Sequence, residues 1–107
     1  MREDVRWVDR DRDGREIYLT GERWEHICDH HPEMAKCEAE LRQTIRVGLR
    51  RQDKVSPQKY RYLLRISHLP GDNTHVEAVV LFRFAEGEEG DLTANNYIVT
   101  AYLKQLR

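Results

Sequence analysis

The spacing of hydrophobic and polar positions divides the chain into two kinds of segment. Short runs over 5–8 and 16–19 alternate like strands, and the Asp13-Gly14 pair between them is typical of a tight turn. Longer runs follow over 59–68, 75–84 and 97–103, and the middle one is almost continuously apolar, as in a central strand. The acidic, glycine-containing residues 86–96 are predicted to form a mobile loop.

In two segments between these runs, the hydrophobic residues recur with the period of an α-helix. Over 20–33, Thr20 is a suitable N-cap, and Pro32 is expected to end the helix. The second helix is predicted over about 33–51. The core-facing stripes are Trp24, Ile27, Cys28 and His31 in the first helix, and Met34, Cys37, Leu41, Ile45, Gly48 and Leu49 in the second.

These elements predict an α+β fold in one domain, residues 1–107. A short N-terminal hairpin is followed by two helices and then by a three- to four-stranded antiparallel sheet packed against the helices. The length of 107 residues is enough for one domain and too short for two.

The composition indicates a soluble domain with a modest core, because hydrophobic residues make up 39% and charged residues 35%. No apolar run approaches the roughly 20 residues of a membrane-spanning helix, and residues 1–6 lack the apolar core of a signal peptide. Cys28 and Cys37 suggest no disulfide framework. We therefore expect a cytoplasmic protein without a membrane partner.

The net charge of −1 conceals a basic segment. Residues 42–65 contain one acid, Asp53, and eight basic residues, which are Arg42, Arg46, Arg50, Arg51, Lys54, Lys59, Arg61 and Arg65. On the second predicted helix, Arg42, Arg46 and Arg50 recur every four residues and would point the same way. The segment suits either a polyanion site or an arginine-rich solvated surface, and both interpretations stay open.

Three of the five histidines lie in the first predicted helix. His26 and His30 share a stripe with Arg23, whereas His31 falls on the core side and is interpreted as bracing the helix end. The His26–His30 spacing would suit a metal, but a zinc site needs three or four ligands and no zinc motif accompanies the pair. We expect neither a metal nor a cofactor.

Imidazoles beside cationic side chains suit proton transfer on a phosphodiester. RNA supplies its own nucleophile, the 2′-hydroxyl, so an enzyme needs a base, an acid and cations around the transition state. Alternation in the last predicted strand places Thr100 and Tyr102 on one face with Ile98 and Lys104. Candidates for the chemical roles are His26, His30, Arg46, Tyr60, Arg61, Arg65, Thr100 and Tyr102.

One extended pattern combines these features. The segment Arg23-Trp24-Glu25-His26-Ile27 continues to His30-His31-Pro32-Glu33, and Tyr60-Arg61-Tyr62 and Thr100-Ala101-Tyr102 follow. Over residues 17–104 the chain resembles small nucleases of the barnase–EndoU–colicin–RelE superfamily, especially phage-associated RelE-like branches. The resemblance implies a domain of two helices and an antiparallel sheet that cleaves RNA without a metal. Such domains are often toxins held by an antitoxin or immunity protein.

The resemblance implies active residues at the matching positions, which are His26, Tyr60 or Arg61, and Thr100 with Tyr102. His31 also matches the motif. The chain departs from the pattern at His30, where many relatives carry arginine, so Arg23 or the Arg42–Arg46–Arg50 row would have to supply that cation. Basic residues expected to contact RNA are Arg42, Arg46, Arg50, Arg51, Arg65 and Lys104.

The leading hypothesis is a metal-independent endoribonuclease of the toxin type that uses attack by the 2′-hydroxyl. The alternative is a non-catalytic domain of the same fold that binds RNA or a protein through residues 42–65. A third hypothesis is a small interaction protein that oligomerises through an edge strand.

Overall fold

A computed structural model describes residues 4–106 of the chain. Strand β1 (Val5–Arg10) and strand β2 (Glu16–Thr20) precede helix α1 (Gly21–His30), the 3₁₀ helix η1 (Pro32–Lys36) and helix α2 (Glu38–Val47). Four strands follow: β3 (Leu49–Gln52), β4 (Lys59–Arg65), β5 (His75–Glu86) and β6 (Leu92–Lys104). The predicted α+β class with two α-helices is therefore confirmed.

All six strands form one sheet, in the order β1-β2-β6-β5-β4-β3. The prediction of three to four antiparallel strands is wrong in both number and direction. The N-terminal hairpin joins the sheet because Ile17 and Tyr18 of β2 pair in parallel with Asn96 and Tyr97 of β6. Strand β3 extends the opposite side by pairing antiparallel with β4.

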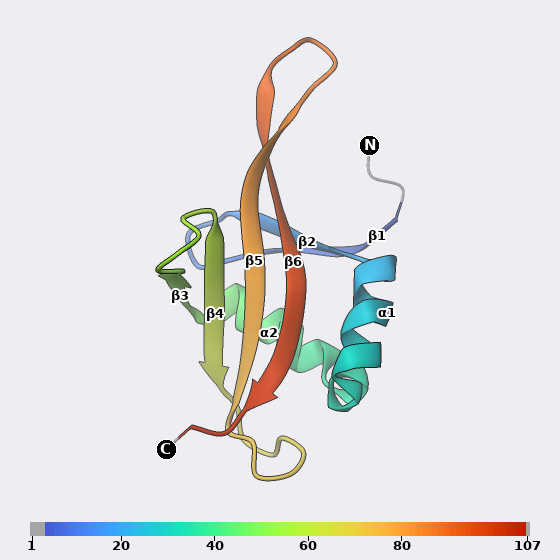
Figure 1. Cartoon of the computed structure of the whole chain (residues 1–107), viewed down its shortest axis with the longest axis vertical. Coiled ribbons are helices and arrows are strands. Elements are labelled where there is room, and N and C mark those ends of the chain that lie inside the picture. Colours follow the sequence, from blue (N-terminus) through green and yellow to red (C-terminus); the bar gives the residue numbers. More distant parts are fainter. Residues whose placement is uncertain (1–3, 107) are drawn as a thin grey trace.

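The helices leave one face of the sheet uncovered, and we call this the open face. Helix α2 lies behind β4 and β5, and α1 lies beside the lower half of β6 (Figure 1). The side chains of Val76, Ala78 and Val80 point from β5 into the core, where they are fully buried. The core is completed from the helices and β2 by Ile17, Leu19, Trp24, Ile27, Met34, Leu41 and Ile45.

The predictions for the first hairpin and the first helix are confirmed. Gly14 adopts a φ of 82° in the turn between β1 and β2, a conformation that favours glycine. The Thr20 hydroxyl accepts a hydrogen bond of 3.1 Å from the backbone nitrogen of Arg23, which caps α1. Helix α1 ends at His30, and Pro32 opens η1.

The second predicted helix is too long at both ends. It begins as η1, continues as α2 and ends at Val47, so Arg50 and Arg51 lie on β3. Gly48 allows this change of direction: a Cβ there would lie 2.4 Å from the carbonyl oxygen of Thr44 and 3.1 Å from that of Leu63. The predicted row of Arg42, Arg46 and Arg50 on one helix is therefore wrong. Leu49, predicted to face the core, is 67% exposed.

The predicted loop over 86–96 is also mostly strand. Strands β5 and β6 run through it and turn only between Glu86 and Leu92. Their ends project well beyond the rest of the sheet (Figure 1). We call residues 82–95 the arm. No helix among residues 4–106 is both long enough and apolar enough to cross a membrane.

Candidate functional site

A groove of about 760 Å³ crosses the open face near its β3 side. Strand alternation brings its residues together, because Arg51 of β3 lies opposite Arg61 of β4, and Leu63 lies opposite Glu77 of β5. The groove is thus lined by basic, acidic and apolar side chains from four strands and one loop. Its lining includes Leu49, Arg51, Asp53, Lys54, Val55, Arg61, Leu63, Glu77, Tyr102 and Lys104.

A β-bulge in β6 determines which of its side chains reach this face. Val79 pairs with Thr100 and Val80 with Ile98, so Val99 is an extra residue in β6. The bulge separates Ile98 from Thr100: Ile98 is buried in the core, whereas Thr100, Tyr102 and Lys104 lie on the open face. The prediction that Ile98 shares their face is wrong, because simple alternation does not hold across a bulge.

Glu77 is the centre of the polar cluster in the groove. It is only 5% exposed, and its carboxylate accepts hydrogen bonds from the Tyr102 hydroxyl, from Arg61 Nη1 at 3.1 Å and from Lys104 Nζ at 3.1 Å. Burial alone would raise the pKa of Glu77, but the hydrogen bonds from Tyr102, Lys104 and Arg61 outweigh it and lower the pKa below its usual value. Glu77 is therefore a carboxylate at neutral pH.

Arg61 and Tyr102 are held by the same network. Arg61 also contacts Asp53, whose Oδ1 lies 3.3 Å from Arg61 Nε, and Asp53 in turn accepts hydrogen bonds from the backbone of its own loop. Arg61 Nη1 donates to the Tyr102 hydroxyl at 3.1 Å. Burial and the bond to Glu77 raise the pKa of Tyr102 to about 12. Tyr102 consequently keeps its proton and acts as a donor.

Of the three histidines predicted on the first helix, His31 contacts this cluster. Strand β2 pairs with β6 only at Asn96 and Tyr97, so the later part of β6 is free to pack against α1 and η1. His31, at the C-cap of α1, thereby places its ring 5.5 Å from the Tyr102 ring, measured between centroids. Its Nδ1 lies 3.7 Å from Glu33, and its side chain is 35% exposed. The ring is therefore both oriented and accessible.

His26 and His30 lie elsewhere. Both are exposed on α1, and their rings stack with centroids 4.1 Å apart. The Nδ1 atom of His30 lies 3.0 Å from the backbone oxygen of His26. Within residues 4–106, neither ring has a hydrogen bond, an ion pair or a ring contact with Arg61, Thr100 or Tyr102. The structure brings together His31, Arg61 and Tyr102 and leaves His26 outside that group.

The remaining predicted residues divide between the two faces. Tyr60 points to the helix side, where it contacts Phe82, and Arg50 stacks over it at 4.3 Å. Arg42 and Arg46 pair with Asp9 of β1 at 2.8 and 3.5 Å. The open face carries the other predicted residues, which are Arg51, Arg61, Arg65, Thr100, Tyr102 and Lys104.

Glu77 was not predicted as a site residue, although the sequence contains a signal for it. It is the one acid in the otherwise apolar run from Val76 to Phe82. A charged residue at the centre of a buried strand requires a partner, because an unpaired buried charge is costly. The partners come from β4 and β6, and the sequence alone did not show which residues these would be.

The structure of residues 4–106 also bears on the question of a metal site. No group of three or more histidine, cysteine, aspartate and glutamate side chains in residues 4–106 is arranged to hold a metal ion. Comparisons with protein-family models, curated proteins and solved structures gave no match to this chain. The resemblance to the nuclease superfamily therefore stays a prediction, and the geometry of the groove is the basis for a functional proposal.

Proposed function

We propose that this chain is an endoribonuclease-type domain whose reaction centre is the Glu77 cluster of the open face. The observation that carries the proposal is that Glu77, Arg61, Tyr102 and Lys104 meet in one groove, while the His31 ring packs against the ring of Tyr102. The cluster contains an ionised carboxylate, an accessible imidazole and two cations, which are the groups that cleavage by a 2′-hydroxyl requires.

In the proposed reaction, Glu77 accepts the proton of the 2′-hydroxyl as the 2′-oxygen bonds to the adjacent phosphorus. The bond between phosphorus and the 5′-oxygen breaks, and protonated His31 gives its proton to that oxygen. The products are a 2′,3′-cyclic phosphate and a 5′-hydroxyl. Arg61 and Lys104 stabilise the charge on the phosphate oxygens, and Tyr102 positions Glu77.

This assignment replaces His26 by His31 as the catalytic histidine. His31 approaches Tyr102, whereas His26 stacks on His30 at the solvent surface. The motif of the nuclease superfamily often has an arginine where this chain has His30. In the proposed site, Arg61 and Lys104 supply that positive charge, since both contact the carboxylate at the centre of the groove.

The test is cleavage of single-stranded RNA in excess EDTA by the wild-type chain and by His31→Ala and Glu77→Gln. We expect each substitution to reduce the rate by about 10²- to 10⁴-fold, the usual contribution of a general acid or base. His30→Ala is the matched control, because His30 is adjacent in sequence, exposed and outside the groove. Circular dichroism establishes that each variant is folded.

Two results would argue against the proposal. Uncleaved RNA with the folded wild-type chain would remove the enzyme hypothesis, and salt-dependent binding without cleavage would favour the non-catalytic alternative. Cleavage that His26→Ala abolishes and His31→Ala leaves intact would return the catalytic role to His26.

A further inference from the structure

The arm, residues 82–95, lacks the support that the rest of the sheet has. Strand β4 pairs with β5 only as far as Leu81, and β2 reaches only Asn96 and Tyr97 of β6. At its root the arm is held by hydrogen bonds from Phe82 N to the backbone oxygen of Gln58 at 2.8 Å and from the Tyr18 hydroxyl to Asn95 at 3.1 Å. Beyond the root its two strands pair with each other, and the arm projects from the molecule (Figure 1). An isolated two-stranded ribbon is marginally stable in water, so a surface that packs against it would stabilise it.

One face of the arm is apolar and exposed. Phe84 pairs with Ala94, and Glu86 pairs with Leu92, so these side chains share the face of Phe82. Phe84 is 73% exposed and Leu92 is 69% exposed. At the root of the arm, the Phe82 ring lies 4.7 Å from that of Tyr60, which extends the apolar surface. Contiguous exposed apolar surfaces of this kind mark interaction sites.

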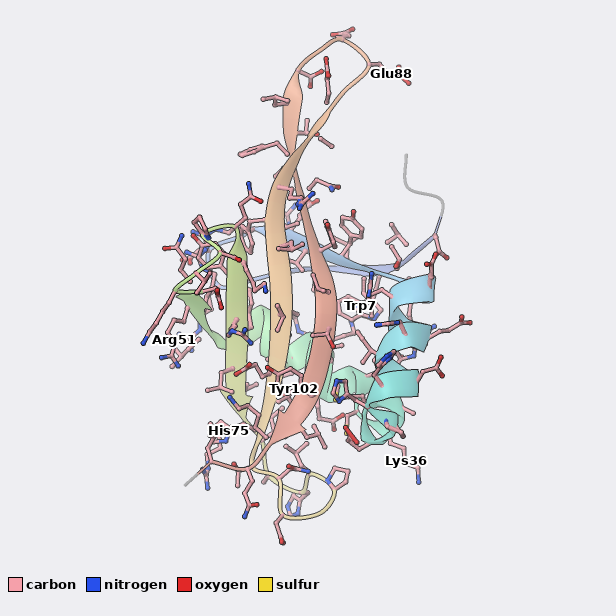
Figure 2. All side chains as sticks on the ribbon, in the orientation of Figure 1. Trp7, Lys36, Arg51, His75, Glu88 and Tyr102 are labelled. Atoms are coloured by element: carbon pink, nitrogen blue, oxygen red, sulfur yellow. The ribbon has the colours of Figure 1, made fainter. Side chains whose placement is uncertain are left out.

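Charge is separated along the arm. The tip is acidic, with Glu86, Glu88, Glu89 and Asp91, and Figure 2 shows Glu88 at the far end of the molecule from Tyr102. The root is basic: Arg50 stacks over Phe82 at 5.5 Å, and Arg83 lines a shallow hollow with Phe82 and Phe84. A surface that is acidic at one end, apolar in the middle and basic at the other end is complementary to itself in reverse orientation.

We propose that the apolar face of the arm binds a second copy of this chain in a symmetric dimer. Two arms would pack antiparallel about a twofold axis near Phe84, so that the acidic tip of each lies at the basic root of the other. A twofold interface of this kind needs one patch that is complementary to itself, which the distribution of charge supplies. The Glu77 cluster lies on the open face, so the proposal does not depend on the proposed function.

The test is sedimentation equilibrium of the full chain from about 1 to about 300 μM, a range that detects micromolar association. We expect wild-type chain to dimerise and Phe84→Asp to raise the dimer dissociation constant by at least about tenfold, as loss of an aromatic anchor does. Val55→Asp is the matched control, since Val55 is 88% exposed and lies outside the arm. Phe84 is mostly exposed, so its substitution should not alter the thermal unfolding of the monomer.

Charge variants test the reversed orientation of the two arms. Glu88→Lys with Glu89→Lys should weaken the dimer, and adding Arg50→Glu, at the residue that stacks over Phe82 on the docking face, should restore part of the affinity because the swapped charges again face one another. Wild-type chain that stays monomeric at every concentration would overturn the proposal. A dimer that Phe84→Asp does not weaken would overturn it as well, because that dimer would use another surface.

Discussion

Among single residues, Glu77 shows how one buried charge can hold several strands together. Its carboxylate joins β4, β5 and β6 through Arg61, Tyr102 and Lys104. The same contacts keep it ionised and hold a hydroxyl and two cations near it. A ligand that draws Arg61 or Lys104 away would leave Glu77 with fewer donors and a greater affinity for a proton. This is the change that a general base needs when its substrate binds.

The lowered pKa of Glu77 predicts a specific dependence of stability on pH. Below its ordinary value of 4.5, the unfolded chain takes up a proton that the folded chain does not, so Glu77 contributes stability that is lost as pH falls through its folded pKa. We expect wild-type chain to be more stable than Glu77→Gln at pH 7 and the difference to shrink as pH falls below 4.5. Urea unfolding over pH 3–7 measures it, and a difference that does not change with pH would contradict the expectation.

At the scale of elements, the transition from α2 to β3 depends on the close approach of two backbones. Gly48 is the residue that allows it, since its φ of −67° suits any residue but its missing Cβ leaves room for the carbonyl oxygens of Thr44 and Leu63. This turn starts β3 directly after the helix. It therefore places Arg51 opposite Arg61 on the open face rather than on the helix.

Gly48→Ala is expected to destabilise the fold by about 1–3 kcal/mol, because the added methyl group forces these backbones apart. Alanine also lowers the conformational entropy of the unfolded chain, and this effect offsets part of the lost stability. Chemical denaturation measures the net effect. Gly71→Ala is an informative comparison: there the nearest atom is 3.7 Å from the added Cβ, but a φ of 65° makes the backbone itself unfavourable for alanine. A Gly48→Ala variant as stable as wild type would show that this junction is not crowded.

In the molecule as a whole, the fold places the arginines of the basic segment 42–65 in two different environments. Arg42 and Arg46 bind Asp9 and join α2 to β1, which favours the solvated-surface interpretation for that part. Arg51 and Arg61 lie in the groove of the open face. Arginines that look alike in the sequence are thus predicted to differ in how much they contribute to RNA binding.

Arg51→Ala is expected to weaken RNA binding and to reduce the slope of log K against log salt concentration by about 0.7, the value for one phosphate contact with a single strand. Arg46→Ala should leave that slope unchanged, since Arg46 lies on the helix side, 3.5 Å from Asp9. Fluorescence titrations at several salt concentrations compare the two variants. Equal slopes for both would mean that the groove does not hold the phosphate.

Elements whose signals are local could be predicted from the sequence. Hydrophobic period, the Thr20 cap, Pro32 and the Asp13-Gly14 turn depend on residues a few positions apart, and the structure has the first hairpin and the first helix where they predicted them. Arg61 and Tyr102 were also named from the sequence, and the fold joins them at 3.1 Å.

Which distant groups meet depends on tertiary contacts that the sequence pattern does not contain. The parallel pairing of β2 with β6, the bulge at Val99 and the end of α2 at Val47 depend on contacts between segments far apart in the chain. These contacts place Glu77 in the groove of the open face and leave His26 on the exposed surface of α1. They also bring His31 next to Tyr102; the sequence analysis interpreted this residue as bracing the end of its helix and also matched it to the nuclease motif. Periodicity describes the faces of one element, whereas a site is formed by the register between elements.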